Sequence, residues 1–254
     1  MNQPLVVGNW KMNGTFLEAS TLTGAIVEGV SQERPKAAVA LAPPATVLVQ
    51  VQQRISASVI ALAGQNCHWE DAGAFTGEVS PVMLREAGCT YVLVGHSERR
   101  HIFHENDEII AKKLAAAIRN RLRAILCVGE TLDQRKGAKT RQVITRQLQI
   151  ALKELKNTDI ANVEIAYEPV WAIGTGHNAD PSQIAEVHGW IRSHLTSSFD
   201  KINGNGVRIL YGGSVNPDNA NELAKIVEVN GLLVGGASLK PETFLPVIRC
   251  FDSE

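Results

Sequence analysis

Eight short runs of apolar residues recur along the 254-residue chain, and this repetition restricts the possible folds more than any other feature. The runs are continuous rather than alternating, which is typical of strands buried on both faces of a parallel sheet. Between them, apolar residues recur every four positions, as Leu22, Ile26 and Val30 do, and this spacing predicts helices with one buried face. The alternation of strand and helix predicts an α/β fold. The expected strands are Leu5–Val7, Ala37–Leu41, Ile60–Ala63, Tyr91–Val94, Ala124–Val128, Val163–Tyr167, Val207–Tyr211 and Leu232–Val234.

The number of runs separates the two main parallel architectures. Eight units in 254 residues correspond to about 32 residues each, the size of one βα unit, and no Pro/Gly/Ser-rich linker divides the chain. A doubly wound open sheet would usually carry Gly-x-Gly-x-x-Gly after its first strand, whereas this chain continues into Gly8-Asn9-Trp10-Lys11. We therefore expect residues 1–254 to form a single (β/α)8 barrel of eight parallel strands surrounded by helices. Its functional residues would lie at the carboxyl ends of the strands.

The composition is that of an ordinary globular protein, and it narrows the class of partner. The chain is 44% hydrophobic with a net charge of -1, so it lacks the basic excess of a nucleic-acid-binding protein. No apolar run approaches the roughly 18 residues of a membrane span, and the first residues lack a signal-peptide pattern. The four cysteines fit no zinc template and are expected to be reduced. These features predict a cytoplasmic protein that binds neither nucleic acid nor membrane.

A glutamate, Glu168, stands directly after the sixth expected strand and is the main catalytic candidate. Burial at a strand end is expected to raise its pKa and make it a better base. The segment Pro169–Gly176 begins with a stiff proline, continues with apolar side chains and ends with glycines, which is the make-up of a lid. The alternative is a salt-bridged glutamate in a tight strand-to-helix loop.

Polar side chains also follow the first and fourth expected strands. Asn9 and Lys11 follow the first, where a lysine near the barrel axis could attract an anionic substrate; the alternative is a solvated loop lysine. His96 follows the fourth, just before Ser97-Glu98, which has the composition of a helix start. The positive end of that helix would disfavour the imidazolium. A neutral imidazole could donate a hydrogen bond to an oxygen that gains negative charge, although a structural histidine fits this segment equally well.

Further charged residues follow His96. Arg99-Arg100 are expected to be solvated or salt-bridged at the helix start. His101 and His104 are three residues apart, a spacing that occurs in metal sites, but they lie beyond the strand end and no third ligand is evident. We therefore expect no metal site.

Two glycine pairs follow the last two expected strands, as Gly212-Gly213-Ser214 and Gly235-Gly236-Ala237-Ser238. Backbone N–H groups of such loops can close around an anion, and barrels commonly bind phosphate after strands seven and eight. The alternative is that these glycines serve only the turns. Together with Glu168, His96 and Lys11, the loops predict proton transfer beside the carbonyl of a small phosphorylated substrate, without a cofactor.

These motifs resemble those of the triosephosphate isomerases, from residue 5 to about residue 250. The segments that carry the resemblance are Asn9-Trp10-Lys11-Met12-Asn13, Gly95-His96-Ser97-Glu98-Arg99-Arg100, Cys127-Val128-Gly129-Glu130, Ala166–Gly176, Tyr211-Gly212-Gly213-Ser214-Val215 and Gly235-Gly236-Ala237-Ser238-Leu239. The resemblance implies a TIM barrel and the isomerase of glycolysis and gluconeogenesis.

The resemblance also implies roles for the matching residues. Glu168 would move a proton between C1 and C2 of dihydroxyacetone phosphate, giving D-glyceraldehyde 3-phosphate through an enediolate. His96 would polarise the carbonyl as a neutral donor, and Lys11, with Asn9 beside it, would stabilise the developing charge. Glu98 would position Lys11 or join the same network. The implied substrate-binding residues are Asn9, Lys11, Gly174, Ser214, Gly235 and Gly236.

The implied lid would exclude water and prevent the enediolate from losing phosphate. Tyr211 and Ser214 would latch it when closed. The residues of the lid would be Pro169, Val170, Trp171, Ala172, Ile173, Gly174, Thr175 and Gly176. Many relatives carry lysine after the last of these glycines, where this chain has His177-Asn178-Ala179. This departure puts the kinetics of the lid in doubt, but not the reaction.

By the same resemblance the chain would form a homodimer through its third loop, Gln65–Glu78. Thr76, at the tip of that loop, would approach Asn9 and Lys11 of the partner subunit. A loop that packs compactly on itself is the alternative. Two other functions stay open at this point: a different phosphate-binding barrel enzyme, such as an aldolase or decarboxylase, and an inactive barrel retained for binding.

Overall fold

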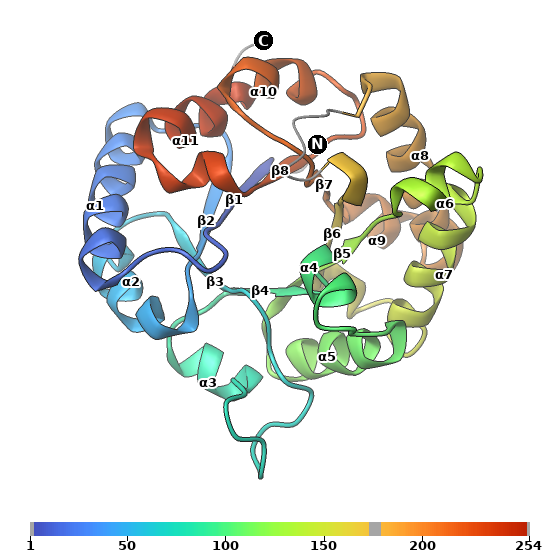
Figure 1. The fold of residues 1–254 in the computed structure, drawn as a ribbon, viewed down its shortest axis with the longest axis horizontal. Coiled ribbons are helices and arrows are strands. Elements are labelled where there is room, and N and C mark those ends of the chain that lie inside the picture. The colour runs from blue at the N-terminus through green and yellow to red at the C-terminus, as the bar shows by residue number, and fades with distance from the viewer. Residues whose placement is uncertain (1–2, 173–178, 253–254) are drawn as a thin grey trace.

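The computed structural model describes residues 3–172 and 179–252, and in it eight parallel strands close into a barrel in the order β1 to β8 (Figure 1). This confirms the predicted fold class. The closing pair is β1 with β8, which brings Gly8 opposite Val234. The strands are β1 (Leu5–Asn9), β2 (Ala38–Ala42), β3 (Ala61–Gly64), β4 (Tyr91–Val94), β5 (Arg123–Val128), β6 (Val163–Tyr167), β7 (Ile209–Tyr211) and β8 (Gly231–Val234).

Helices surround the barrel, as the spacing of apolar residues predicted (Figure 1). Ile26 and Val30 are buried on the first helix, and Ile110 and Leu114 on the fifth. The helices are α1 (Phe16–Glu33), α2 (Leu48–Ile55), α3 (Pro81–Glu86), α4 (Ser97–His101), α5 (Asp107–Arg119), α6 (Leu132–Lys136), α7 (Thr140–Leu152), α8 (Pro181–Ser198), α9 (Lys201–Gly206), α10 (Pro217–Ala224) and α11 (Pro241–Ile248). Short 3-10 turns are η1 (Ala45–Val47), η2 (Ile160–Asn162), η3 (Val170–Ala172), η4 (Gly236–Leu239) and η5 (Arg249–Phe251).

Two apolar layers explain why the strands are continuously apolar. Strand residues such as Val6 point outward and pack in one buried cluster with helical residues such as Ile26. Leu5, Val7 and Ile125 belong to a second buried cluster made of strand residues, which fills the inside of the barrel. Because successive side chains of a strand point to opposite sides, both sides of each strand are buried and both are apolar.

The seventh strand differs from its predicted range. It begins at Ile209, two residues later than expected. The side chain of Arg208 turns instead to the buried carboxylate of Glu164, with its Nη2 2.6 Å from Oε1, and Arg123 shares that carboxylate. The expected strand Val207–Tyr211 included Arg208, and the apolar pattern alone did not predict its ion pair with Glu164.

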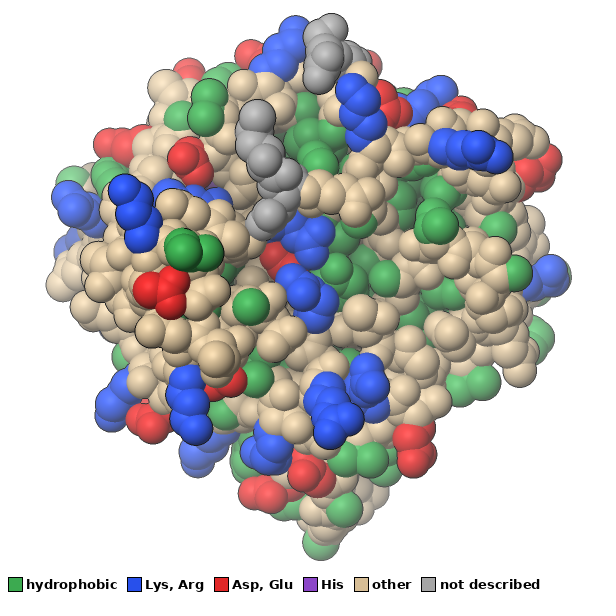
Figure 2. All heavy atoms as spheres, turned by 180° about the vertical axis from the view of Figure 1, so that it is seen from behind, with side chains coloured by type: hydrophobic (Ala, Val, Ile, Leu, Met, Phe, Trp, Pro, Cys, Tyr) green, Lys and Arg blue, Asp and Glu red, His purple; other side chains and the backbone are tan. Residues whose placement is uncertain are grey.

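The charged residues after β4 form ion pairs, which confirms the interpretation of a salt-bridged helix start. Arg99 Nη2 lies 2.6 Å from Glu105, and Arg100 Nη1 lies 2.6 Å from Asp107. On the face opposite to that of Figure 1, basic and acidic side chains are interspersed rather than gathered into one large patch of a single sign (Figure 2). In the described part of the chain, no helix combines the length and apolarity needed to cross a bilayer.

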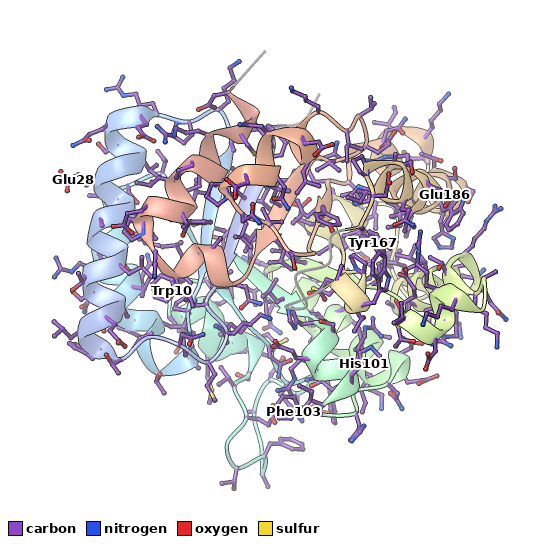
Figure 3. The ribbon with its side chains drawn as sticks, turned by 45° about the horizontal axis from the view of Figure 1, so that its top comes forward. Trp10, Glu28, His101, Phe103, Tyr167 and Glu186 are labelled. Carbon is purple, nitrogen blue, oxygen red and sulfur yellow. The ribbon has the colours of Figure 1, made fainter. Side chains whose placement is uncertain are left out.

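A buried histidine of α8 gives the fold a specific dependence on pH. His188 is completely buried, its Nδ1 lies 2.9 Å from the carbonyl oxygen of Glu228, and its ring meets that of Tyr167 edge-on with the centroids 5.8 Å apart. Tyr167 lies in the interior (Figure 3). Burial lowers the pKa of His188 to about 4. The folded protein therefore keeps this ring neutral at pH values where the unfolded chain protonates it.

We expect this histidine to make the protein less stable as the pH falls from about 6.5 to about 4. Over that range the unfolded chain binds a proton that the folded chain does not, so His188 alone removes up to about 3 kcal/mol from the free energy of unfolding. His188→Asn keeps a donor near Glu228 and should show a smaller loss between these pH values in urea-unfolding measurements. The exposed His104→Asn is the control and should behave as the wild type does. Equal losses in wild type and His188→Asn would contradict this assignment.

Candidate active site

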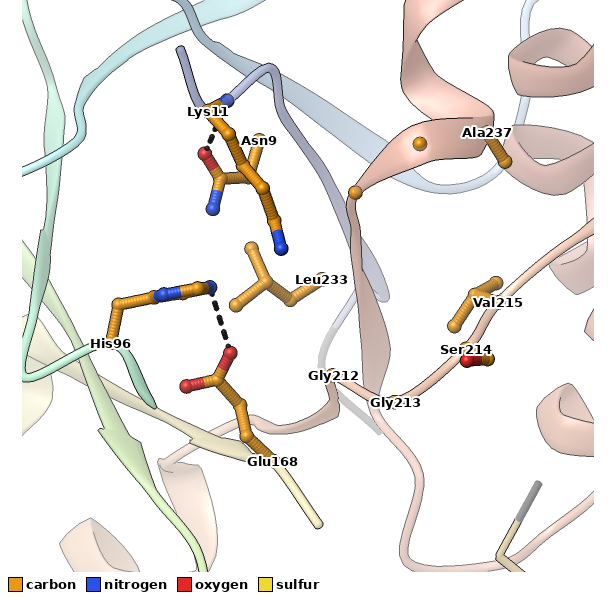
Figure 4. A pocket seen from close by; sticks show the side chains of 12 residues that line it. Asn9, Lys11, His96, Glu168, Gly212, Gly213, Ser214, Val215, Leu233 and Ala237 are labelled. Atoms are coloured by element: carbon orange, nitrogen blue, oxygen red, sulfur yellow. Dashed lines mark hydrogen bonds and ion pairs between the residues drawn. The ribbon is translucent and has the colours of Figure 1, made fainter. Parts of the chain in front are cut away.

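A cavity of about 260 Å³ opens at the carboxyl ends of the strands and brings together most of the predicted catalytic and substrate-binding residues (Figure 4). His96 lies on one side of it and Ser214 and Val215 lie on the other, while Gly212 lies beside Glu168. It is lined by Asn9, Lys11, His96, Glu168, Gly212, Gly213, Ser214, Val215, Leu233, Gly235, Gly236 and Ala237.

Glu168 is held at the end of β6 by two hydrogen bonds. Its Oε2 accepts the backbone N–H of Ser97 at 2.9 Å, and its Oε1 lies 2.9 Å from Nε2 of His96 (Figure 4). Only 2% of Glu168 is exposed, so water provides little of its solvation. The carboxylate therefore depends on these protein donors to stay ionised.

The net effect on Glu168 is opposite to the one expected from burial alone. Burial raises its pKa, but the charge and hydrogen bond of His96, the Ser97 N–H and the charge of Lys11 outweigh burial and hold the pKa below its ordinary value. For His96 the balance also favours the charged form. Burial lowers its pKa, yet the nearby Glu168 carboxylate raises it by more. The helix start predicted to oppose this charge is real, but α4 has only five residues.

The other ring nitrogen of His96 fixes which tautomer the neutral ring adopts. Nδ1 accepts the backbone N–H of Glu98 at 3.3 Å, so His96 itself caps α4. A nitrogen that accepts a hydrogen bond carries no proton. In the neutral ring the proton is therefore on Nε2, the atom that faces Glu168 and the cavity.

Lys11 reaches the cavity from the loop after β1. Its backbone adopts a left-handed conformation with φ of 53°, and its N–H donates to Oδ1 of Asn9 at 3.1 Å. Its Nζ lies 2.6 Å from Oε1 of Glu98, the pairing that the resemblance implied. Gln65, which sequence reasoning did not single out for this, donates from Nε2 to the carbonyl oxygens of Lys11 and Ala42 at 2.8 Å. The lysine is thus fixed at both its backbone and its charged end.

The glycine loops provide the space beside these charged groups. A Cβ on Gly212 would lie 3.0 Å from Cγ of Glu168, and one on Gly213 would overlap the hydroxyl of Tyr211. Gly235 lies beside the end of Lys11, and η4 begins at Gly236. A side chain at position 212 would displace Glu168, and one at position 213 would displace Tyr211. Glycine is therefore required at these two positions by the space available and not only by the turn.

The described part of the predicted lid is tied to the barrel at Ala172. Ser214 Oγ donates to the carbonyl oxygen of Ala172 at 2.5 Å, and the chain reaches this residue from Pro169 through η3, which includes Val170 and Trp171. Tyr211 is buried, which raises its pKa to about 12, and the backbone of Ala179 acts on it in the opposite direction. The other predicted lid and hinge residues, Ile173, Gly174, Thr175, Gly176, His177 and Asn178, lie outside the described residues.

A buried glutamate that the sequence analysis quoted but gave no role supports the start of the lid. Glu130 is fully buried, and its carboxylate accepts hydrogen bonds from the hydroxyl of Tyr167 at 3.1 Å and from Nε1 of Trp171 at 3.0 Å. Its carbonyl oxygen accepts the N–H of Val170 at 3.1 Å. The signal available in the sequence was an acidic residue two positions after an apolar run. Its partners could not be read from the sequence.

Thr76, the predicted dimer contact, does not line the cavity. It is exposed on the loop between β3 and α3, which projects from the barrel (Figure 1). Near His101, at the end of α4, and His104, which follows it, Glu105 is paired with Arg99 and Lys113. Within residues 3–172 and 179–252, no group of three or more His, Cys, Asp or Glu side chains is placed to hold a metal ion.

Comparisons with known proteins agree over almost the whole chain. The family model described as triosephosphate isomerase matches residues 4–251. The triosephosphate isomerases of Chloroherpeton thalassium and Aquifex aeolicus are each 47% identical to the chain, over 249 residues (98% of this chain and 99% of the relative) and 248 residues (97% and 99%). The crystal structure of triosephosphate isomerase from Bartonella henselae superposes with a TM-score of 0.90 at 42% identity, covering 99% of this chain and 100% of that one. The chain therefore belongs to the triosephosphate isomerase family.

Proposed function

We propose that this chain interconverts dihydroxyacetone phosphate and D-glyceraldehyde 3-phosphate, acting as one catalytic barrel over residues 1–254. The observation that carries the proposal is the placement of Glu168, His96 and Lys11 around one cavity, beside the glycine loops after β7 and β8. Family membership supplies the substrate. The reaction moves a proton within one molecule, so it requires neither a cofactor nor a metal.

Glu168 acts as the base. Its carboxylate takes a proton from C1 of dihydroxyacetone phosphate, the electron pair of that C–H bond forms the C1–C2 double bond, and the carbonyl oxygen becomes negatively charged. A proton then passes from the hydroxyl on C1 to the oxygen on C2. Return of the carbon-bound proton from Glu168 to C2 leaves an aldehyde at C1 and a hydroxyl at C2, which is the aldose. A substrate oxygen placed between His96 and Glu168 removes the hydrogen bond by which the carboxylate raises the pKa of His96, and burial then favours the neutral ring. The Nε2–H of this neutral ring donates to the developing oxyanion, and Lys11, held near Asn9 and Glu98, stabilises the same charge.

The hydrogen bond between Glu168 and His96 explains how an acid with a lowered pKa can act as a base. His96 and Ser97 keep the carboxylate ionised before substrate binds. A substrate oxygen that takes the Nε2–H of His96 removes one of these stabilising contacts while the site stays buried. Burial then dominates and raises the pKa of Glu168, so the carboxylate becomes more basic next to the substrate carbon.

The phosphate lies against Ser214, Gly235 and Gly236, with Gly174 of the lid completing its contacts. Backbone N–H groups of these loops donate to its oxygens, and the start of η4 adds a small favourable field. Closure of Pro169–Gly176, latched by Tyr211 and Ser214, excludes water and keeps the enediolate from releasing phosphate. The four free, buried thiols support a reducing compartment, and we place the protein in the cytoplasm.

Glu168→Gln should lower kcat on D-glyceraldehyde 3-phosphate by about 100-fold or more, because the amide has nearly the same shape but cannot accept the proton. A coupled assay that consumes dihydroxyacetone phosphate measures this. Glu186→Gln on the outer side of α8 (Figure 3) is the matched control and should keep wild-type turnover. A loss of tenfold or less in Glu168→Gln would remove the proposed role of Glu168.

We propose further that two copies associate through the loop between β3 and α3. Contacts within the loop order it. The ring of His68 stacks on that of Trp69 with the centroids 4.0 Å apart, and the ring centroid of Phe75 lies 4.1 Å from that of His68. Phe75 is nevertheless 42% exposed, and Met12, next to Lys11, is 95% exposed. A rigid loop with exposed apolar surface loses little entropy on docking and gains from burial. Thr76 at its tip would then approach Asn9 and Lys11 of the partner subunit.

The wild type should have twice the 27.5 kDa mass of one chain in sedimentation equilibrium. Thr76→Arg places a charge at the tip of the loop and should shift the mass toward one chain and lower turnover together, because the loop supports the partner's site. Ser197→Arg, exposed on α8, is the control and should change neither. A wild type with the mass of a single chain at micromolar concentration would exclude the dimer.

A further inference from the structure

The start of the lid rests on a buried carboxylate that needs a positive charge. Glu130 is fully buried, and two of its donors, Tyr167 and Trp171, are neutral. A buried carboxylate is costly unless a cation accompanies its hydrogen bonds. Arg135 provides this charge, with its Nη1 3.2 Å from Oε1 of Glu130. Both residues are largely shielded from water, since the side chain of Arg135 is only 18% exposed.

Arg135 also touches the lid directly. Its guanidinium lies over the ring of Trp171, with Cζ 5.4 Å from the ring centroid. The same oxygen of Glu130 accepts hydrogen bonds from Arg135 and from Nε1 of Trp171. Arg135 therefore contacts Trp171 both through the ring face and through the shared carboxylate, and these contacts together fix the position and tilt of the indole.

The helix that carries Arg135 is itself firmly placed. Thr131 and Gln134 form a reciprocal capping box at the start of α6. On the other side, Trp171 is separated from Glu168 by two residues, Pro169 and Val170, and the next residue accepts the hydrogen bond of Ser214. A shift of the indole is thus transmitted over a very short path to the candidate base and to the latch.

We propose that Arg135 is a positioning residue for the lid: by pairing with Glu130 and lying over the ring of Trp171, it sets where the lid begins. This inference rests on the proposed isomerase function for its kinetic consequences, but not for the contact itself. Arginine suits the position because its planar group can stack and donate at once, whereas the ammonium of lysine cannot stack.

Three variants separate this role from a general effect of charge or of stability. Arg135→Met keeps much of the apolar stem but removes the charge and the plane, and Arg135→Lys keeps the charge alone. Lys136→Met removes the same charge from the adjacent, exposed position of α6. The measurements are kcat/KM, the ratio of inorganic phosphate released to isomerised product, and the ¹⁹F resonance of Trp171 in protein labelled with fluorotryptophan.

Arg135→Met should lower kcat/KM by about tenfold and raise the phosphate-release ratio by a similar factor, because a misplaced lid exposes the enediolate to water. It should also move the Trp171 resonance, identified with Trp171→Phe, while those of Trp10, Trp69 and Trp190 stay in place. Arg135→Lys should fall between Arg135→Met and the wild type, and Lys136→Met should match the wild type.

A purely structural role predicts a different result: a lower melting temperature with unchanged phosphate-release ratio and unchanged Trp171 resonance in the folded protein. That result in Arg135→Met, or in Arg135→Lys if the methionine variant does not fold, would overturn the proposal. If the wild type shows no isomerase turnover, the proposed function fails, while the Trp171 resonance still tests the contact. An unmoved resonance would then reject the positioning role separately.

Discussion

The pairing of β1 with β8 is the constraint on which the site depends. It joins residues near the two ends of the chain, setting Gly8 opposite Val234. Lys11, after the first strand, is thereby brought beside Gly235, after the last. Parallel strands place all their carboxyl ends on one face, and closure turns that face into a ring around one cavity. An open sheet of the same strands would leave Lys11 and the glycine loop after β8 on opposite edges.

Within that ring, the proposed chemistry depends on the electrostatic balance at Glu168. A carboxylate 2% exposed would ordinarily be protonated more readily than one in water, yet two hydrogen bonds and two nearby cationic or ionisable groups reverse the direction. The same geometry leaves the balance easy to change, because one of those hydrogen bonds comes from His96, which faces the cavity. In the proposed mechanism, Glu168 is therefore ionised before substrate binds and becomes more basic once His96 donates to another acceptor.

The fold was largely predictable from the sequence, because continuous apolar runs are a local property that can be recognised without knowing which residues are in contact. The candidate residues at the strand ends were also predictable, because the carboxyl ends of all strands of a parallel barrel lie on one face. The direction of the pKa shift at Glu168 was not, because it depends on His96 and on the Ser97 N–H, which is 71 positions away in the chain. Gln65, Glu130 and Arg135 were missed as supporting residues because their partners lie on other strands and loops, and residue type alone does not identify a partner.

The most direct test of the account is deuterium exchange at the reacting carbon. Dihydroxyacetone phosphate is incubated with the wild-type protein in deuterated water and followed by NMR spectroscopy. The account predicts enzyme-dependent deuterium at C1 of dihydroxyacetone phosphate and at C2 of the aldose formed, because a carboxylate that holds the proton between the two carbons exchanges it with solvent. Conversion of the substrate with no deuterium at either carbon, or no conversion at all, would contradict it.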